Sequence, residues 1–164
     1  MLEVKFYDTV DDSLLKFAVI ISQSNGKWVF CKHKERDTYE VPGGHREVGE
    51  DILETAKREL QEETGAIQFD IKPICVYSVT GKNSVNETGE ETFGLLCFAE
   101  ITEFAGKLES EIEKVELIDE LPQNWTYPLI QPKLIEKYLQ IEKQSYGRIQ
   151  LAAKQNIAYI KKDY

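Results

Sequence analysis

Short apolar runs separated by polar loops predict a series of β-strands along this chain. These runs lie at residues 2–7, 15–22, 27–33, 39–41, 67–80, 92–101 and 115–118. The pair Asn25-Gly26 favours a tight turn, so it is expected to join the second and third runs into a hairpin. A polar loop rich in Gly, Asn and Thr separates the runs at 67–80 and 92–101.

Three segments have the spacing of amphipathic helices instead. In 51–64, Leu53, Ala56 and Leu60 form one apolar stripe, and Gly65 is expected to end the helix. A second helix is predicted from Pro128, and a third over 148–164. Strands that alternate irregularly with few helices predict an α/β fold in which helices sandwich a mixed sheet. We expect a main domain over residues 1–142 and a helical extension over 143–164, which packs on the domain or on a partner subunit.

The segment 44–66 carries an excess of acidic side chains. Within fourteen residues, six carboxylates face only two cations, Lys57 and Arg58; the acids are Glu50, Asp51, Glu54, Glu59, Glu62 and Glu63. Like charges three or four residues apart destabilise a helix by about 0.2–0.5 kcal/mol per pair. Acids near the C-terminal end of a helix cost about 0.3–1 kcal/mol each. A solvated acidic helix does not explain this crowding at the unfavourable end, so we expect a bound cation.

The spacing of three of these acids indicates where the cation binds. Glu59, Glu62 and Glu63 stand at i, i+3 and i+4, so their oxygens can converge. Clustered hard oxygen ligands suit Mg²⁺ or Mn²⁺. Arg58 lies beside Glu62, where it can orient a carboxylate. Upstream, Pro42-Gly43-Gly44 is expected to form a rigid turn that brings backbone carbonyls close to the cation.

These residues resemble the signature of the Nudix hydrolases. Gly44 is followed after five residues by Glu50, and after seven more by the run from Arg58 to Gly65. Only the last position departs, because Ala66 replaces a larger aliphatic residue. The resemblance implies the Nudix fold, an α/β/α sandwich with a mixed β-sheet. It also implies hydrolysis of the pyrophosphate linkage in a nucleoside diphosphate joined to another group, with Mg²⁺ or Mn²⁺ as cofactor.

The resemblance also implies roles for individual residues. The metal ligands that match it are Glu59, Glu62, Glu63, Glu50 and a carbonyl of Gly43 or Gly44. The catalytic residues are Glu59, Arg58 and Glu62. We choose Glu59 as the base that deprotonates the attacking water, and Glu111 and Glu113 are its rivals. Gly44 and Tyr39 are expected to contact the substrate.

The substrate is less closely defined than the reaction. The stretch KERDTYEVPGG at 34–44 resembles that of MutT-type enzymes, which favours a (d)NTP or oxidised dGTP and a house-cleaning role. ADP-ribose, dinucleoside polyphosphates and the 5′ triphosphate ends of RNA remain alternatives. An alternative of another class is a non-catalytic nucleotide-binding module. Such modules usually lack some of the carboxylates, and this chain keeps them all.

Composition narrows the partners and the compartment. With 20 Lys and Arg against 29 Asp and Glu, the net charge is −9, which argues against general nucleic-acid binding. A phosphorylated substrate is therefore expected to bind together with its cations. No apolar run is long enough to cross a bilayer, and no secretory leader is recognised. Cys31, Cys75 and Cys97 show no paired spacing and are interpreted as buried reduced thiols. We expect a cytoplasmic protein without a membrane partner. One expected role of the extension is to join two copies of the chain in a homodimer.

Overall fold

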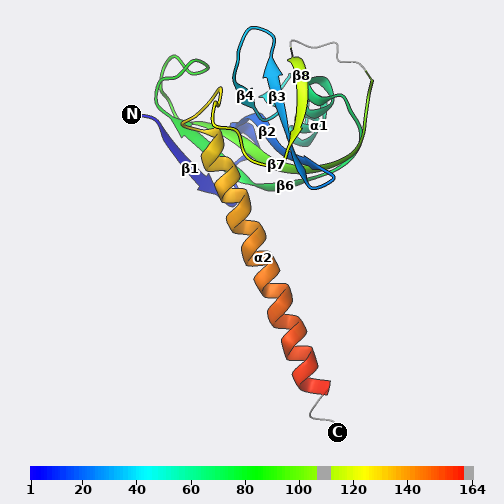
Figure 1. The fold of residues 1–164 in the computed structure, drawn as a ribbon. Helices are drawn as coiled ribbons and strands as arrows, with labels where there is room; N and C mark the ends of the chain where they lie inside the picture. Colours follow the sequence, from blue (N-terminus) through cyan, green and yellow to red (C-terminus); the bar gives the residue numbers. More distant parts are fainter. Residues whose placement is uncertain (107–111, 161–164) are drawn as a thin grey trace. The chain divides into compact units, whose positions relative to one another are not determined.

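An eight-stranded mixed β-sheet is the largest element of the described structure (Figure 1). This computed structural model describes residues 1–106 and 112–160, and the side chains of 1–106 and 115–148. The strands of this described part are β1 (Glu3–Tyr7), β2 (Leu15–Ser24), β3 (Lys27–His33), β4 (Tyr39–Glu40), β5 (Gly43–His45), β6 (Ala66–Thr80), β7 (Thr92–Phe104) and β8 (Ile112–Ile118). Its helices are a short 3-10 helix (Asp12–Leu14), α1 (Ile52–Thr64) and α2 (Gln131–Ile160).

The order of the strands confirms the predicted mixed sheet and the α/β class. The strands lie side by side as β1-β6-β7-β2-β3-β4, with β5 also paired to β2 and β8 to β3. The β2 and β7 strands are parallel, whereas the other named pairs are antiparallel. The predicted hairpin turn is confirmed, because both Asn25 and Gly26 adopt positive φ angles, of 51° and 75°.

The predicted turn at Pro42-Gly43-Gly44 is wrong in its geometry. Gly43 and Gly44 belong to β5, where they pair with Val19 and Ala18 of β2. Neither glycine adopts a positive φ angle. The residues after Pro42 continue as an extended strand, because β2 offers an edge for pairing there. This pairing fixes both glycines on the rigid sheet.

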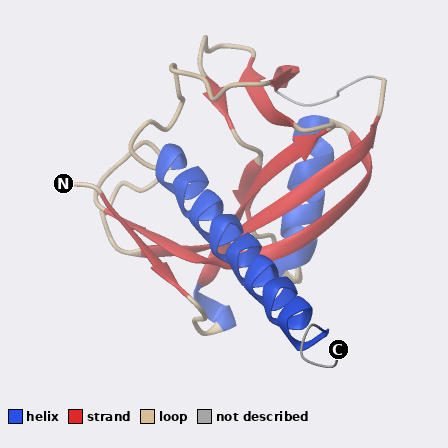
Figure 2. Ribbon diagram, turned by 60° about the horizontal axis from the view of Figure 1, so that its bottom comes forward, coloured by secondary structure: helices blue, strands red, loops and turns tan. Residues whose placement is uncertain are grey.

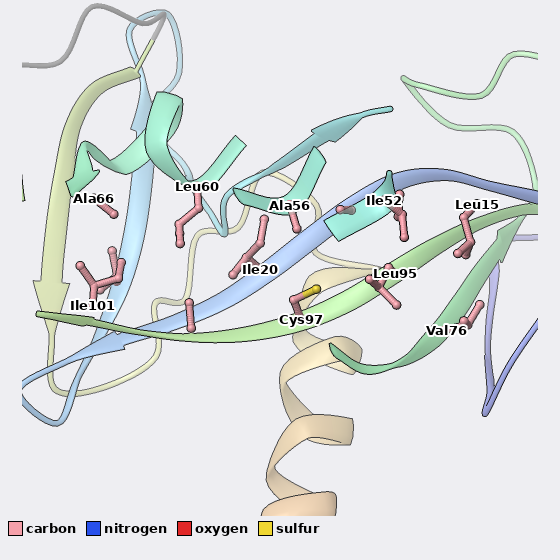
Figure 3. Close-up of a cluster of buried hydrophobic side chains, with 13 residues drawn as sticks. Leu15, Ile20, Ile52, Ala56, Leu60, Ala66, Val76, Leu95, Cys97 and Ile101 are labelled. Carbon is pink, nitrogen blue, oxygen red and sulfur yellow. The ribbon is translucent and has the colours of Figure 1, made fainter. Parts of the chain in front are cut away.

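Helix α1 lies against the sheet (Figure 2), and the predicted apolar stripe faces the core. Asp51 caps its first turn, and a capping box with Glu54 satisfies the exposed backbone N–H groups there. Ala56 and Leu60 are buried in the core beside Ile20 of β2 and Cys97 of β7 (Figure 3). The helix ends as predicted at Gly65, whose φ angle of 74° is left-handed.

The second and third predicted helices are one helix. Helix α2 starts at Gln131, three residues after Pro128, and runs unbroken to Ile160, across the predicted boundary at residue 142. A single Gly147 within it costs only about 1 kcal/mol and does not stop a helix. The chain divides into two compact units, Met1–Gln131 and Pro132–Tyr164, and the first contains the whole sheet and α1. In the described residues, no helix is both long and apolar enough to cross a membrane.

Candidate metal and active site

Two acidic side chains of α1 lie against the short strand β5. Glu59 and Glu63 stand one helical turn apart and face the backbone of Gly43 and Gly44. The Gly43 N–H donates to Oε2 of Glu63 at 3.3 Å. The helix and the strand therefore place the predicted carboxylates and the predicted glycines in one locus.

Gly44 leaves the space that the Glu59 carboxylate occupies. A Cβ atom built on Gly44 would overlap with both carboxylate oxygens of Glu59. The Glu59 side chain is only 12% exposed, so the carboxylate has little room to move aside. The position requires glycine because a carboxylate packs directly on the backbone, and no special backbone angle is involved.

The Glu59 and Glu63 carboxyl groups are in hydrogen-bond contact with each other. Burial raises the pKa of both groups above the ordinary value for glutamate, and at Glu63 the charge of Glu59 adds to this effect. The shift is larger at Glu63, because Arg58 partly offsets it at Glu59. Without a cation the pair therefore favours a state that keeps one proton. A dication fits here, because its charge would replace that proton.

Arg58 connects three of the predicted acids. Its Nε and Nη2 atoms donate to the two oxygens of Glu50 at 2.6 and 3.0 Å. Its Nη1 atom donates to Glu59 at 2.8 Å and to Glu62 at 3.4 Å. The Arg58 guanidinium lowers the pKa of Glu50 to about 2. Glu50 would have to release these donors before it could bind a cation.

The structure thus brings together some of the predicted ligands and not others. Glu59 and Glu63 are adjacent, whereas Glu62 is 54% exposed and directed toward Arg58. Among the residues described here, no three His, Cys, Asp or Glu side chains gather closely enough to hold an ion as they stand. The Glu62 carboxylate instead accepts from the Nη1 atom of Arg58 at 3.4 Å.

Three residues at positions that the recognised signature does not fix also belong to this locus. Glu40 of β4 is half-buried near Glu63, and burial raises its pKa. Arg46 donates to the Glu50 backbone carbonyl at 2.8 Å and to Asp12, which ties the loop before α1 to the start of β2. The Thr55 hydroxyl donates to Glu50. Only Glu40 carried a usable signal in the sequence, an acid two residues before Pro42.

The remaining predicted site residues are less informative. Tyr39 lies on β4, where its backbone bonds to Asn124 and Thr126. Glu111 lies outside the described residues, as does the side chain of Glu113. The choice between Glu59 and these two acids as the general base therefore stays a prediction.

The sequence of this chain is similar to a known family model and to a known protein. The family model described as "NUDIX domain" matches residues 13–138. A Bacillus subtilis (strain 168) protein, provisionally named 8-oxo-dGTP diphosphatase YtkD, is 34% identical over 127 residues, which cover 74% of this chain and 73% of that protein.

Two solved structures share the fold. A variant of the Bacillus subtilis pyrophosphohydrolase BsRppH is 27% identical with a TM-score of 0.68, and the match covers 85% of this chain and 90% of that chain. A NUDIX hydrolase from Nitrosomonas europaea is 22% identical with a TM-score of 0.62, and the match covers 77% of this chain and 89% of that chain. The likeness to the second structure concerns the fold alone.

Proposed function

We propose that this chain, which belongs to the Nudix hydrolase family, is a pyrophosphohydrolase that cleaves nucleoside triphosphates, with (d)NTPs or oxidised dGTP as its substrates. The observation that carries the proposal is the Glu59 and Glu63 pair packed against Gly43 and Gly44. Buried acids that keep a proton between them are costly unless a cation binds there. The family generally uses divalent metal ions, and we propose Mg²⁺ or Mn²⁺ because all the available donors are hard oxygens.

We assign the metal to Glu59, Glu63 and Glu62, together with the Gly43 carbonyl. Glu62 would turn from Arg58 toward the ion, which its exposed position allows. Glu50 then contributes to the metal site indirectly, because its carboxylate accepts from Arg58 and holds that side chain in place. When bound, the metal supplies neutralisation of phosphate charge and a lower pKa for a coordinated water.

The residues of the chain position the reaction. Water attacks a phosphorus of the triphosphate, the bond from that phosphorus to the bridging oxygen breaks, and pyrophosphate leaves. Glu59 accepts the proton of the water, and its orientation is fixed by the bond from Arg58 to Oε1. Gly44 leaves room for that carboxylate, and Tyr39 remains our candidate for contact with the nucleoside.

The substrate assignment is supported by sequence similarity. The relative named as an 8-oxo-dGTP diphosphatase matches over about three quarters of both chains. The relative named as a pyrophosphohydrolase agrees with the reaction type. ADP-ribose, dinucleoside polyphosphates and RNA 5′ triphosphate ends are the competing substrates. We further propose a cytoplasmic setting, in keeping with three buried cysteines that form no disulfide. A homodimer stays a prediction.

A panel of substrates tests this proposal. The purified full chain is assayed with Mg²⁺ against dGTP, 8-oxo-dGTP, ADP-ribose, diadenosine tetraphosphate and triphosphorylated RNA, and pyrophosphate and phosphate release are read separately. We expect the highest kcat/KM on 8-oxo-dGTP or dGTP, with pyrophosphate as product. Glu59→Gln serves as the matched inactive control, because it removes one charge and keeps the shape. Activity on none of the compounds would favour the non-catalytic binding module.

A further inference from the structure

Thr55 lies in the first turn of α1. Its hydroxyl points back toward Glu50, which precedes the N-cap residue Asp51. Thr55 is 0% exposed. Its Oγ1 atom donates to Oε1 of Glu50 at 2.9 Å, whereas the carbonyl of Asp51, one helical turn back, is 3.4 Å away. A threonine inside a helix usually bonds to the carbonyl four residues before it. Here the Glu50 carboxylate is the closer acceptor, so the hydroxyl donates mainly to Glu50.

Glu50 has few ways to move once this bond is made. Its Oε1 atom also accepts from the Glu47 backbone N–H at 2.9 Å, and both of its oxygens accept from Arg58. The Glu50 side chain is only 15% exposed. Three groups therefore fix the plane of one carboxylate, and Thr55 contributes the fully buried hydroxyl among them.

The fixed carboxylate in turn sets the direction of Arg58. A guanidinium group is planar, so the pairing of Nε and Nη2 with Glu50 determines where Nη1 points. That Nη1 atom lies 2.8 Å from Oε1 of Glu59. Nη2 also donates to the backbone carbonyl of His45 at 3.0 Å, next to Gly44. A shift of the Glu50 carboxylate would therefore move Arg58, and with it the bond from Arg58 to Glu59.

We propose that Thr55 is a positioning residue, whose hydroxyl holds Glu50 so that Arg58 aligns Glu59 for the reaction. Nothing in the recognised signature fixes this position, which is one of the seven residues between Glu50 and Arg58. The inference rests on the proposed function, because it concerns the alignment of the same site.

Thr55→Val removes the hydroxyl and keeps the branched shape, and Thr55→Ser keeps the hydroxyl. We expect Thr55→Val to lower kcat by about tenfold with little change in KM, and Thr55→Ser to restore most of the loss. Thr92→Val is the matched control, because that hydroxyl donates to the Val79 backbone carbonyl on the sheet. It should leave kcat unchanged. Thr55→Ala replaces Thr55→Val if the valine variant does not fold.

A double-mutant cycle separates positioning from a general structural role. If Thr55 acts through Glu50, Thr55→Val should cause no further loss of kcat in a Glu50→Ala background. A loss as large in that background as in the wild-type chain would overturn the proposal.

A spectroscopic readout keeps the test independent of activity. In protein with ¹⁵N-labelled arginine, the Arg58 Nε–H signal should exchange faster with water in Thr55→Val than in the wild type or in Thr92→Val. An unchanged signal would overturn the positioning role. If the wild-type chain hydrolyses no compound of the panel, the proposed function fails, and this signal alone still decides whether Thr55 orders Arg58.

Discussion

We propose that Glu63 couples the protonation of the site to cation binding. Its pKa is raised in the folded chain without a cation, so the folded state holds a proton that the unfolded state releases above about pH 4.3. The free energy of unfolding of the metal-free protein therefore falls as pH rises through neutrality. A cation replaces the proton, so the stabilisation by Mg²⁺ should grow with pH.

Thermal unfolding checks this expectation. The increase in Tm on adding saturating Mg²⁺ should be larger at pH 8 than at pH 6 in the wild type. In Glu63→Gln, which cannot ionise at this position, the difference between the two pH values should shrink. An equal Mg²⁺ effect at both pH values in the wild type would argue against Glu63 as the group that exchanges a proton for the metal.

Gly44→Ala should disable the site through crowding. The added Cβ would overlap with the Glu59 carboxylate, and overpacking of this kind costs about 1–3 kcal/mol of stability. Because Glu59 has to move, we expect kcat to fall by roughly a hundredfold, the size seen when one oriented group is lost. Gly106→Ala is the control, since a Cβ there meets no atom within 4 Å. Equal kcat in the two variants would contradict the close packing of Glu59 on β5.

The spacing of residues predicted the acids of the site but not all of their contacts. Charge repulsion along one helix is visible in a sequence, so the need for a cation at Glu59, Glu62 and Glu63 could be inferred. The contact of Glu59 with Gly44 joins a helix to a strand, and no local pattern encodes it. The bond from Thr55 to Glu50 could not be predicted either, because a threonine in a helix is compatible with many different contacts.

Helix α1 should depend on its cap. The Asp51 side chain accepts from the Leu53 N–H at 2.9 Å and takes part in a capping box with Glu54. Loss of such a cap costs about 0.5–2 kcal/mol. Asp51→Ala should lower the free energy of unfolding by about 1 kcal/mol in urea titrations, and Asp51→Asn should recover most of it. A cap that contributes nothing would give the same midpoint in all three proteins.

Elements defined by local periodicity were predicted well, and those defined by distant pairing were not. Helix α1 and the hairpin turn at Asn25-Gly26 follow from local signals and are confirmed. The local sequence Pro42-Gly43-Gly44 suggested a turn. The strand β5 forms there instead because β2 has an edge to pair with, and this distant pairing leaves no local signal. In α2, the expected break was placed in a polar stretch that remains compatible with a helix.

The three thiols report on the core of the whole molecule. Cys31, Cys75 and Cys97 form no disulfide and are buried on three different strands. Burial raises the pKa of Cys97 to about 12 and that of Cys31 well above its ordinary value, so neither forms much thiolate at pH 8. Ellman's reagent at pH 8 should label the native protein at least about a hundredfold more slowly than the protein unfolded in guanidinium chloride. Rapid labelling of the native chain would show that the sheet opens readily.

We propose that a divalent cation binds between α1 and β5. Crystals of the full chain soaked in Mn²⁺ and measured at the manganese absorption edge would locate it. We predict an anomalous peak within bonding distance of Glu59, Glu63 and the Gly43 carbonyl, with Glu62 turned toward it. Strong peaks elsewhere, with Glu59 and Glu63 still paired to each other and no peak beside them, would contradict the claim.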